Sequence, residues 1–305
     1  MTETNAVDEL ERRFGIPGTV RFEADQNGLI RAIVETPHAE ATLYLHGAHV
    51  THYQPRGGLP VLFTSRESRF QSGQPIRGGV PIVFPWFGPH GVDSSAPMHG
   101  FARVAEWRLE AANQEPDGSV VLSFGLDSAR ATHPAWPHAY AAHYSVRIGP
   151  RLELSLEVTN PSDRTVTYEE ALHTYLAVED VRVVEIRGLA GATYADNTDG
   201  MKRKTQESEP LRITGETDRV YLGTQATCVL EDPAAGRRLF VEKWGSDATV
   251  VWNPWVAKAK AMPDFGDEEW PRMLCIETAN VGEYTIQLPP GARHVLGARI
   301  WSESL

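Results

Sequence analysis

The feature that most constrains the fold of this chain is a long series of short β-branched or aromatic runs separated by turn residues. In the run at residues 151–158, Leu152, Leu154 and Leu156 alternate with charged or polar residues. A period of two buries one face of a strand and leaves the other in solvent. Further runs of this kind lie at 29–35, 41–45, 120–126, 144–148, 165–168, 183–186, 238–242, 249–252, 273–277, 283–288 and 294–300.

Such a chain has few folds available to it. The runs are not separated by helical patterns of roughly 10–15 residues, which a parallel α/β sheet needs for its crossovers. The sequence therefore predicts an all-β protein, a large antiparallel β-sandwich. No Ser/Gly-rich linker, low-complexity tract or fixed-period repeat divides the chain, so we expect residues 1–305 to form a single domain.

Turn and loop residues add local detail. Residues 6–13, followed by a glycine and a proline, predict one short N-terminal helix. The Asn-Pro-Ser-Asp sequence at 160–163 predicts a turn that joins the run before it to the run at 165–168 in a hairpin. Residues 71–98 and 253–272 are long and rich in Pro and Gly, which is typical of binding loops or lids.

The composition limits which binding partners and which cellular compartment are expected for this protein. The formal charge of −11, from 40 acidic and 29 basic residues, argues against nucleic acid, although a few focused arginines could still bind a small anion. The two cysteines, Cys228 and Cys275, show no metal-binding spacing, which fits a reducing compartment. With no secretory leader and no apolar stretch of about 18 residues, the sequence predicts a cytoplasmic protein without membrane contact, and we expect a monomer.

Several cofactor and nucleophile motifs are absent from the sequence. It contains no G-x-x-x-x-G-K-[ST], G-x-G-x-x-G, H-E-x-x-H or G-x-S-x-G. Phosphate cradles for nucleotides, dinucleotide turns, zincin sites and nucleophile elbows are thus unsupported. We expect chemistry that requires no cofactor and no metal.

The segment PIRGGVPIVFPWFGP surrounds a single arginine, Arg77, with glycine, proline and aromatic residues. Gly78 and Gly79 are expected to let the backbone approach a ligand closely. Trp86 and Phe87 offer apolar faces to a sugar ring, and the guanidinium is a planar fork for hydroxyl or phosphate oxygens. The alternative is a packed loop with a surface arginine.

The sequence MHGFAR places His99 and Arg103 on either side of a glycine-containing turn. Both are candidates for substrate binding. Taken alone the motif is weak, because a histidine beside apolar residues is more often a hydrogen-bonded structural group.

Two titratable residues lie in apolar strand-like segments. His173 lies within ALHTYLAV, which we interpret as the middle of one strand, and Glu277 ends the apolar run MLCIE. Burial shifts the pKa of such groups and makes acids and bases of them. The alternatives are a hydrogen-bonded core histidine and a salt-bridged strand end.

Asp218, in GETDRVY, and the tryptophans of WNPW, Trp252 and Trp255, lie between these two segments in the sequence. The aspartate is as consistent with a turn residue as with a ligand of sugar hydroxyls. For the tryptophans, core packing is the preferred interpretation.

Taken together, these motifs resemble the aldose 1-epimerase superfamily, and most closely its hexose-6-phosphate mutarotase branch. An ordered match of several motifs is far more specific than any one of them. The blocks that carry the resemblance are RGGVPIVFPWFG from Arg77, HGFAR from His99 to Arg103, LHTY around His173, ETDRVY around Asp218, WNPW, and CIE ending at Glu277.

The resemblance implies a galactose mutarotase-like β-sandwich and an isomerase that interconverts the α and β anomers of a hexose 6-phosphate, glucose 6-phosphate being the first candidate. It implies that His173 is the general acid and Glu277 the general base. It also implies that His99 assists at the ring oxygen or a hydroxyl and that Asp218 binds a hydroxyl.

The resemblance also implies that Arg77 and Arg103 bind the phosphate and the sugar. One position departs from the family pattern: a glutamine often precedes the histidine of HGFAR, whereas here Met98 does. A thioether cannot donate a hydrogen bond, so the preferred hexose stays open. The alternatives are a non-catalytic carbohydrate-binding protein, an epimerase for unphosphorylated aldoses, and a lyase or glycosidase on a similar sandwich, the last needing two carboxyl groups around the bond.

Overall fold

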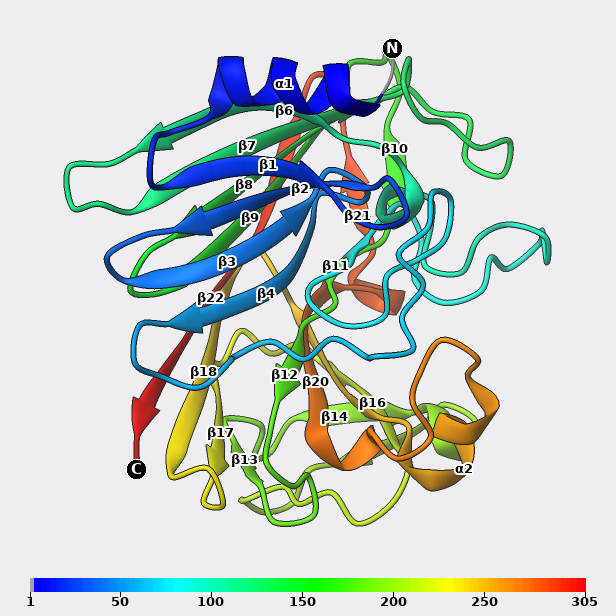
Figure 1. The fold of residues 1–305 in the computed structure, drawn as a ribbon. Helices are drawn as coiled ribbons and strands as arrows, with labels where there is room; N and C mark the ends of the chain where they lie inside the picture. The colour runs from blue at the N-terminus through cyan, green and yellow to red at the C-terminus, as the bar shows by residue number, and fades with distance from the viewer. Residues whose placement is uncertain (1–2) are drawn as a thin grey trace.

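Antiparallel sheets dominate the computed structural model, which describes residues 3–305 (Figure 1). One eight-stranded sheet has the strand order β13, β17, β18, β22, β9, β8, β7, β6. Its hydrophobic faces supply much of the core. Its bounds are β6 Arg108–Gln114, β7 Val120–Asp127, β8 Ala141–Ile148, β9 Leu152–Thr159, β13 Glu185–Arg187, β17 Cys228–Asp232, β18 Arg237–Trp244 and β22 Arg293–Ser304.

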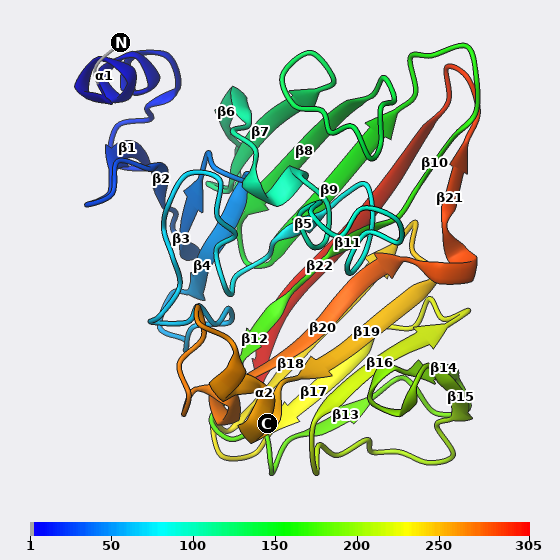
Figure 2. The same cartoon turned by 90° about the vertical axis from the view of Figure 1, so that its right-hand side faces the viewer.

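A second eight-stranded sheet has the order β15, β14, β16, β19, β20, β11, β5, with β12 also paired to β20. Figure 2 shows β20, β19 and β16 side by side on the viewer's side of the molecule. The bounds of this sheet are β5 Ile82–Val83, β11 Glu170–Leu172, β12 Tyr175–Ala177, β14 Thr193–Asp196, β15 Lys202–Thr205, β16 Thr217–Leu222, β19 Ala248–Asn253 and β20 Met273–Asn280.

Two smaller sheets and a few helices complete the fold. The four-stranded sheet runs in sequence order from β1 to β4, and β10 pairs with β21. The bounds are β1 Val20–Ala24, β2 Ile30–Glu35, β3 Ala39–Tyr44, β4 His49–Pro55, β10 Val166–Tyr168, β21 Ile286–Leu288, α1 Glu3–Phe14, α2 Trp255–Ala261, and the 3₁₀ turns Ala102–Val104, Asn197–Asp199, Trp270–Arg272 and Gly282–Tyr284. None of the helices within residues 3–305 is long and apolar enough to span a membrane.

The predicted all-β antiparallel architecture is confirmed, since every named strand pair in residues 3–305 is antiparallel. The alternation predicted for residues 151–158 appears as strict alternation of buried and half-buried residues along β9. The N-terminal helix is also confirmed as α1. That the whole chain is a single domain stays a prediction.

Three local predictions were wrong. β9 has β8 and β22 on its two sides, so the run at 165–168 cannot form a hairpin with it and pairs as β10 with β21 instead. The apolar segment around His173 is broken into β11 and β12, with the histidine in the break. The long loop at 253–272 contains a helix, α2, that the periodicity did not predict.

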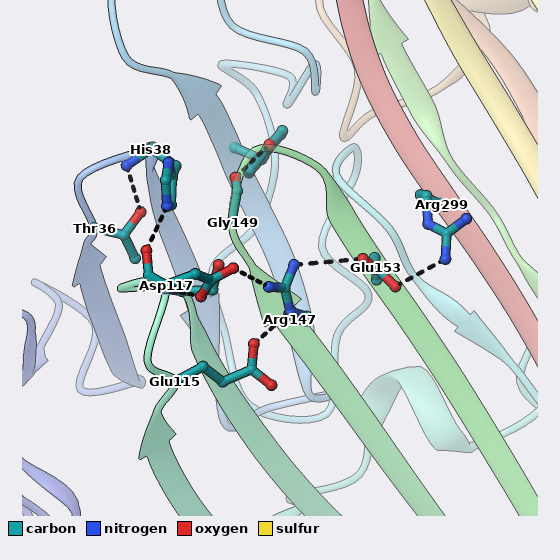
Figure 3. A network of polar contacts seen from close by, with 10 residues as sticks. Thr36, His38, Glu115, Asp117, Arg147, Gly149, Glu153 and Arg299 are labelled. Atoms are coloured by element: carbon teal, nitrogen blue, oxygen red, sulfur yellow. Dashed lines mark hydrogen bonds and ion pairs between the residues drawn. The ribbon is translucent and has the colours of Figure 1, made fainter.

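A polar network ties the four-stranded sheet to the large sheet of β6–β9 (Figure 3). His38 Nε2 lies 2.8 Å from the carbonyl oxygen of Asp117. Arg147 on β8 donates to Glu115 at 2.7 Å, to Asp117 at 2.6 Å and to Glu153 at 3.4 Å. One guanidinium thus compensates three carboxylates that would otherwise repel one another.

Replacing Arg147 with methionine should lower the free energy of unfolding by about 1 kcal/mol, at the upper end of the range for exposed ion pairs because a network is lost. Urea unfolding measures it. The matched control is Arg164→Met, which removes a pair with Asp163 whose side chains are 78% and 90% exposed. Equal unfolding free energies for the two variants would contradict a stabilising role for the network.

Candidate active site

The second eight-stranded sheet presents a row of functional side chains on one face. Glu277 and Cys275 lie two residues apart on β20 and therefore point to the same side. Cys275 is opposite Trp252 of β19, which is opposite Asp218 of β16. In an antiparallel ladder, residues directly opposite each other share a face. Asp218 and Glu277 therefore face the same side of the sheet, two strands apart.

His173 reaches this face from the break between β11 and β12. Leu172 and Tyr175, which flank the break, pair with Thr278 and Cys275 of β20. The backbone N–H of His173 donates to the carbonyl of Pro81, and the imidazole stacks on the Tyr175 ring with centroids 4.8 Å apart. Leaving the strand ladder frees the histidine to turn toward β20.

The histidine and the glutamate are in direct contact. His173 Nε2 lies 3.3 Å from Glu277 Oε1, and the two side chains are only 7% and 1% exposed. The other polar atom of each group, His173 Nδ1 and Glu277 Oε2, is buried without a hydrogen-bond partner. Unsatisfied buried polar atoms are rare in stable structures and often mark sites that bind a ligand. The pair therefore has the character of a site prepared for a polar substrate.

Burial shifts the two pKa values in opposite directions. It raises the pKa of Glu277 well above its usual value, and the negative charge of Asp218 adds to the shift. Burial lowers the pKa of His173 well below its usual value, and the positive charges of Arg103 and Arg77 add to it. The uncharged form of each group is favoured, so burial disfavours the charged pair of carboxylate and imidazolium.

His99 stands edge-on to His173, with ring centroids 5.6 Å apart. Its backbone has φ of 63°, a left-handed conformation that is uncommon for a residue with a side chain. The N–H of Gly88 donates to His99 Nδ1 at 3.1 Å, so the neutral ring carries its proton on Nε2. Burial, Arg103 and His173 lower the pKa of His99 well below its usual value. His99 is thus a neutral hydrogen-bond donor at this site.

Arg77 is held by two partners. Its Nε and one terminal nitrogen donate to the carboxylate of Asp264 at 3.2 and 3.0 Å, and the other terminal nitrogen donates to the Tyr175 hydroxyl at 3.2 Å. A guanidinium has five N–H groups, so donors remain for a substrate. The charge of Arg77 is nevertheless compensated by Asp264.

Arg103 differs, because it has no carboxylate partner within the described residues. Its side chain donates one hydrogen bond, to the carbonyl of Met98 at 2.7 Å, and its Nε is buried without a partner. The residue is only 5% exposed. Burial lowers the pKa of Arg103 to about 10, and Arg77 adds to the shift. A buried cation without a counterion is costly, and an anionic ligand would remove that cost.

Asp218 borders a cavity whose lining includes residues of β14 and β16 but neither His173 nor Glu277. Its carboxylate accepts a hydrogen bond from Asn197 at 2.7 Å and lies 3.7 Å from Lys258 Nζ. The cavity has a volume of 340 Å³, within the range of small-ligand sites. Its lining includes Phe87, Glu169, Asn197, Arg203, Asp218 and Val220.

A larger groove of 840 Å³ lies elsewhere and is lined by none of the predicted site residues. Its lining includes His52, Glu269 and several arginines. Neither this groove nor the smaller cavity is lined by His173 or Glu277, and of the predicted site residues only Asp218 lines the smaller one. Size alone therefore does not identify the site.

Comparisons with known proteins agree with this geometry. The sequence model described as aldose 1-epimerase matches residues 32–301. This chain belongs to the aldose 1-epimerase family. The predicted family, the galactose mutarotase-like fold and an isomerase that interconverts anomers are thereby confirmed.

Relatives of this epimerase carry a more specific name. A Cenchrus ciliaris protein named "Putative glucose-6-phosphate 1-epimerase" is 37% identical over 261 residues, covering 82% of this chain and 78% of the relative. An Escherichia coli K12 protein of the same name is 34% identical and covers 88% of both chains. A crystal structure from Salmonella typhimurium described as that of "a putative mutarotase", 28% identical, superposes with a TM-score of 0.88 over 98% of this chain and 100% of the other.

Two interpretations of the arginine loop of this epimerase need correction. Gly78 and Gly79 have positive φ values, and a Cβ on them would lie 2.4 Å from Thr64 Cα and 2.1 Å from the carbonyl of Val50. These glycines are therefore required for close packing against protein backbone, which accounts for them without a ligand. Trp86 is buried against Phe101, His90 and His133 and belongs to the core, whereas Phe87 does line the cavity.

The structure brings His173, Glu277, His99, Arg77 and Arg103 into one electrostatically connected cluster, with Asp218 at its edge. Their roles in binding and catalysis stay predictions. Sequence reasoning missed Asp264 as the partner of Arg77. The only signal for it was the long acidic loop at 253–272.

Proposed function

We propose that this epimerase interconverts the α and β anomers of a hexose 6-phosphate, with His173 and Glu277 as the proton-transfer pair. The observation that carries the proposal is their contact of 3.3 Å between side chains that are only 7% and 1% exposed. The two oxygens that exchange protons during ring opening are bonded to the same carbon of the sugar. An acid and a base that serve them must therefore be neighbours, as these two groups are.

In the proposed reaction, Glu277 takes the proton of the anomeric hydroxyl while His173 donates one to the ring oxygen, and the bond between C1 and the ring oxygen breaks. The open-chain aldehyde rotates about C1–C2, and the reverse proton transfers close the other anomer. The carboxylate with imidazolium and the carboxylic acid with imidazole hold the same number of protons. The favoured resting state thus needs only a shift of one proton within the pair to become reactive.

Arg103 supports a phosphorylated substrate. It is buried, lacks a carboxylate partner and, together with Arg77, disfavours the protonated form of His173. A phosphate that bound both arginines would supply the missing negative charge. It would also favour the imidazolium that donates the proton. A neutral hexose can do neither.

The remaining parts of the proposal concern the protein as a whole. We propose that it works as a monomer in the cytoplasm, folds as one domain, and binds no nucleic acid. Both cysteines are unpaired and buried, which fits a reducing compartment. Size-exclusion chromatography with light scattering tests the monomer, and a dimer mass would overturn it.

Magnetisation-transfer NMR tests the function directly, since it measures exchange between anomers at equilibrium. Glucose, galactose and mannose are compared with their 6-phosphates, with and without the protein. We expect faster exchange for at least one 6-phosphate than for its free sugar. Faster exchange for free sugars alone would favour an epimerase of unphosphorylated aldoses, and saturable binding without faster exchange would favour a carbohydrate-binding protein.

Replacing Arg103 with methionine should lower kcat/KM for the 6-phosphate by roughly 30-fold, because about 2 kcal/mol of charge-assisted hydrogen bonding is lost. The loss for the free hexose should be smaller. The variant should fold, since it removes an uncompensated buried charge. Arg77→Ala should likewise affect the phosphorylated sugar more. Equal losses for both sugars in both variants would argue against phosphate recognition.

A further inference from the structure

Cys275 is a buried thiol beside the catalytic pair that the proposed reaction does not use. One ligand atom each of His173, Cys275 and Glu277 lies within 4.8 Å of the others. Nitrogen, sulfur and carboxylate oxygen are the donors that zinc takes in proteins. We propose that these three residues form a binding site for Zn²⁺ and related thiophilic ions, and that the bound ion blocks the active site.

The backbone fixes the three donors relative to one another. Cys275 and Glu277 project from the same face of β20, and Tyr175, two residues after His173, pairs with Cys275. Zinc bonds of about 2.0–2.3 Å in a tetrahedral site require donors roughly 3–4 Å apart. Side-chain shifts of about 1 Å would therefore close the three donors around an ion, leaving a fourth position for water.

A second observation points to a ligand here. Glu277 Oε2 and His173 Nδ1 are buried and have no hydrogen-bond partner, although a buried polar atom without one carries a substantial energetic cost. A carboxylate with one oxygen free and the other 3.3 Å from the imidazole can turn toward a cation without breaking an existing hydrogen bond. A cation bound there would favour the ionised form of Glu277, which burial otherwise disfavours.

Binding of the ion would release protons from its ligands and would also fill part of the active site. The thiol of Cys275 must lose its proton to form the zinc–sulfur bond, and the proton shared by His173 and Glu277 must also leave to solvent. The ion would then occupy both groups that exchange protons with the sugar. Zinc is thus an inhibitor competing with the sugar, and this inhibitory role rests on the proposed function of the pair.

Isothermal titration of the full-length protein with ZnCl₂ tests the site without reference to activity. We expect one ion per chain, with a heat that changes with the buffer because protons are released. Affinity should fall about tenfold or more in Cys275→Ser, since even outer-shell changes cost 10–100-fold. The matched control is Cys228→Ser, which changes the other buried thiol, on β17, and should bind zinc as the wild type does.

Two further readouts make the result decisive. Co²⁺ should give a thiolate charge-transfer absorption in the wild type and in Cys228→Ser but not in Cys275→Ser, and Zn²⁺ should inhibit anomer exchange competitively with the sugar. No binding, equal zinc affinity in Cys275→Ser, or a cobalt spectrum without the thiolate band in the wild type would overturn the site. Titration and cobalt spectra do not depend on catalytic turnover. A protein that binds zinc but does not catalyse anomer exchange would therefore contradict the proposed function without contradicting the zinc site.

Discussion

His173→Ala and Glu277→Gln should each lower kcat/KM for anomer exchange by about 10²–10⁴-fold, the usual contribution of a positioned acid or base. Removing both should cost little more than removing one, because the pair acts as a unit. Glutamine has the shape of a protonated glutamic acid, the form that burial favours for Glu277, so this variant should fold. Magnetisation-transfer NMR on glucose 6-phosphate measures the rates.

The chain offers a matched control pair. His143 and Glu110 are also a histidine and a glutamate in contact, with His143 Nδ1 3.4 Å from Glu110 Oε2, but their side chains are 48% and 33% exposed in the other large sheet. His143→Ala and Glu110→Gln should leave exchange unchanged. Wild-type exchange in both variants of the buried pair would remove His173 and Glu277 from the mechanism.

The fold class was predictable because the spacing of hydrophobic residues can be read from the sequence alone. The alternation in β9 needs no knowledge of its neighbours. Strand pairing was not predictable in the same way: the turn at 160–163 suggests a hairpin, but whether β9 has a free edge depends on β8 and β22, which are placed by the rest of the fold.

The candidate site likewise contains residues that the sequence predicted and contacts that it could not predict. His173 and Glu277 were identifiable as titratable residues in apolar segments, and their motifs added weight. The partner of Arg77 was not, since Asp264 lies 187 residues further along the chain in a loop without a motif. The uncompensated charge of Arg103 was likewise invisible, because the absence of a partner is a property of the folded surroundings and not of the sequence HGFAR.

Histidines that are buried in their neutral form should make this protein lose stability as the pH falls through about 6.5. Burial lowers the pKa of His49 to about 3, and the imidazole contacts the carbonyl of Gly78 at 2.7 Å. His99 and His173 are lowered well below their usual value, chiefly by burial. These three histidines stay neutral in the folded protein at a pH at which the unfolded chain binds protons.

This difference in proton binding between the folded and unfolded states determines how the free energy of unfolding changes with pH. Above about pH 7.5 the three histidines are almost entirely neutral in both states and contribute little pH dependence. As the pH falls below 6.5, the unfolded state gains protons that the folded state does not, so the free energy of unfolding decreases. His49 accounts for a loss of about 1.4 kcal/mol between pH 7.5 and 5.5, and His99 and His173 add losses of the same sign, whereas the raised pKa of Glu277 acts in the opposite direction.

Urea unfolding at the two pH values measures this loss, and His49→Gln should reduce it by about 1.4 kcal/mol. Glutamine can still donate a hydrogen bond to the carbonyl of Gly78 but does not titrate. His173→Gln should also reduce the loss and serves as a second variant if the first does not fold. His143→Gln, which changes an exposed histidine, should retain the full wild-type loss. Equal losses of stability in the wild type, His49→Gln and His173→Gln would contradict this explanation. They would mean that groups other than the buried neutral histidines cause the acid instability.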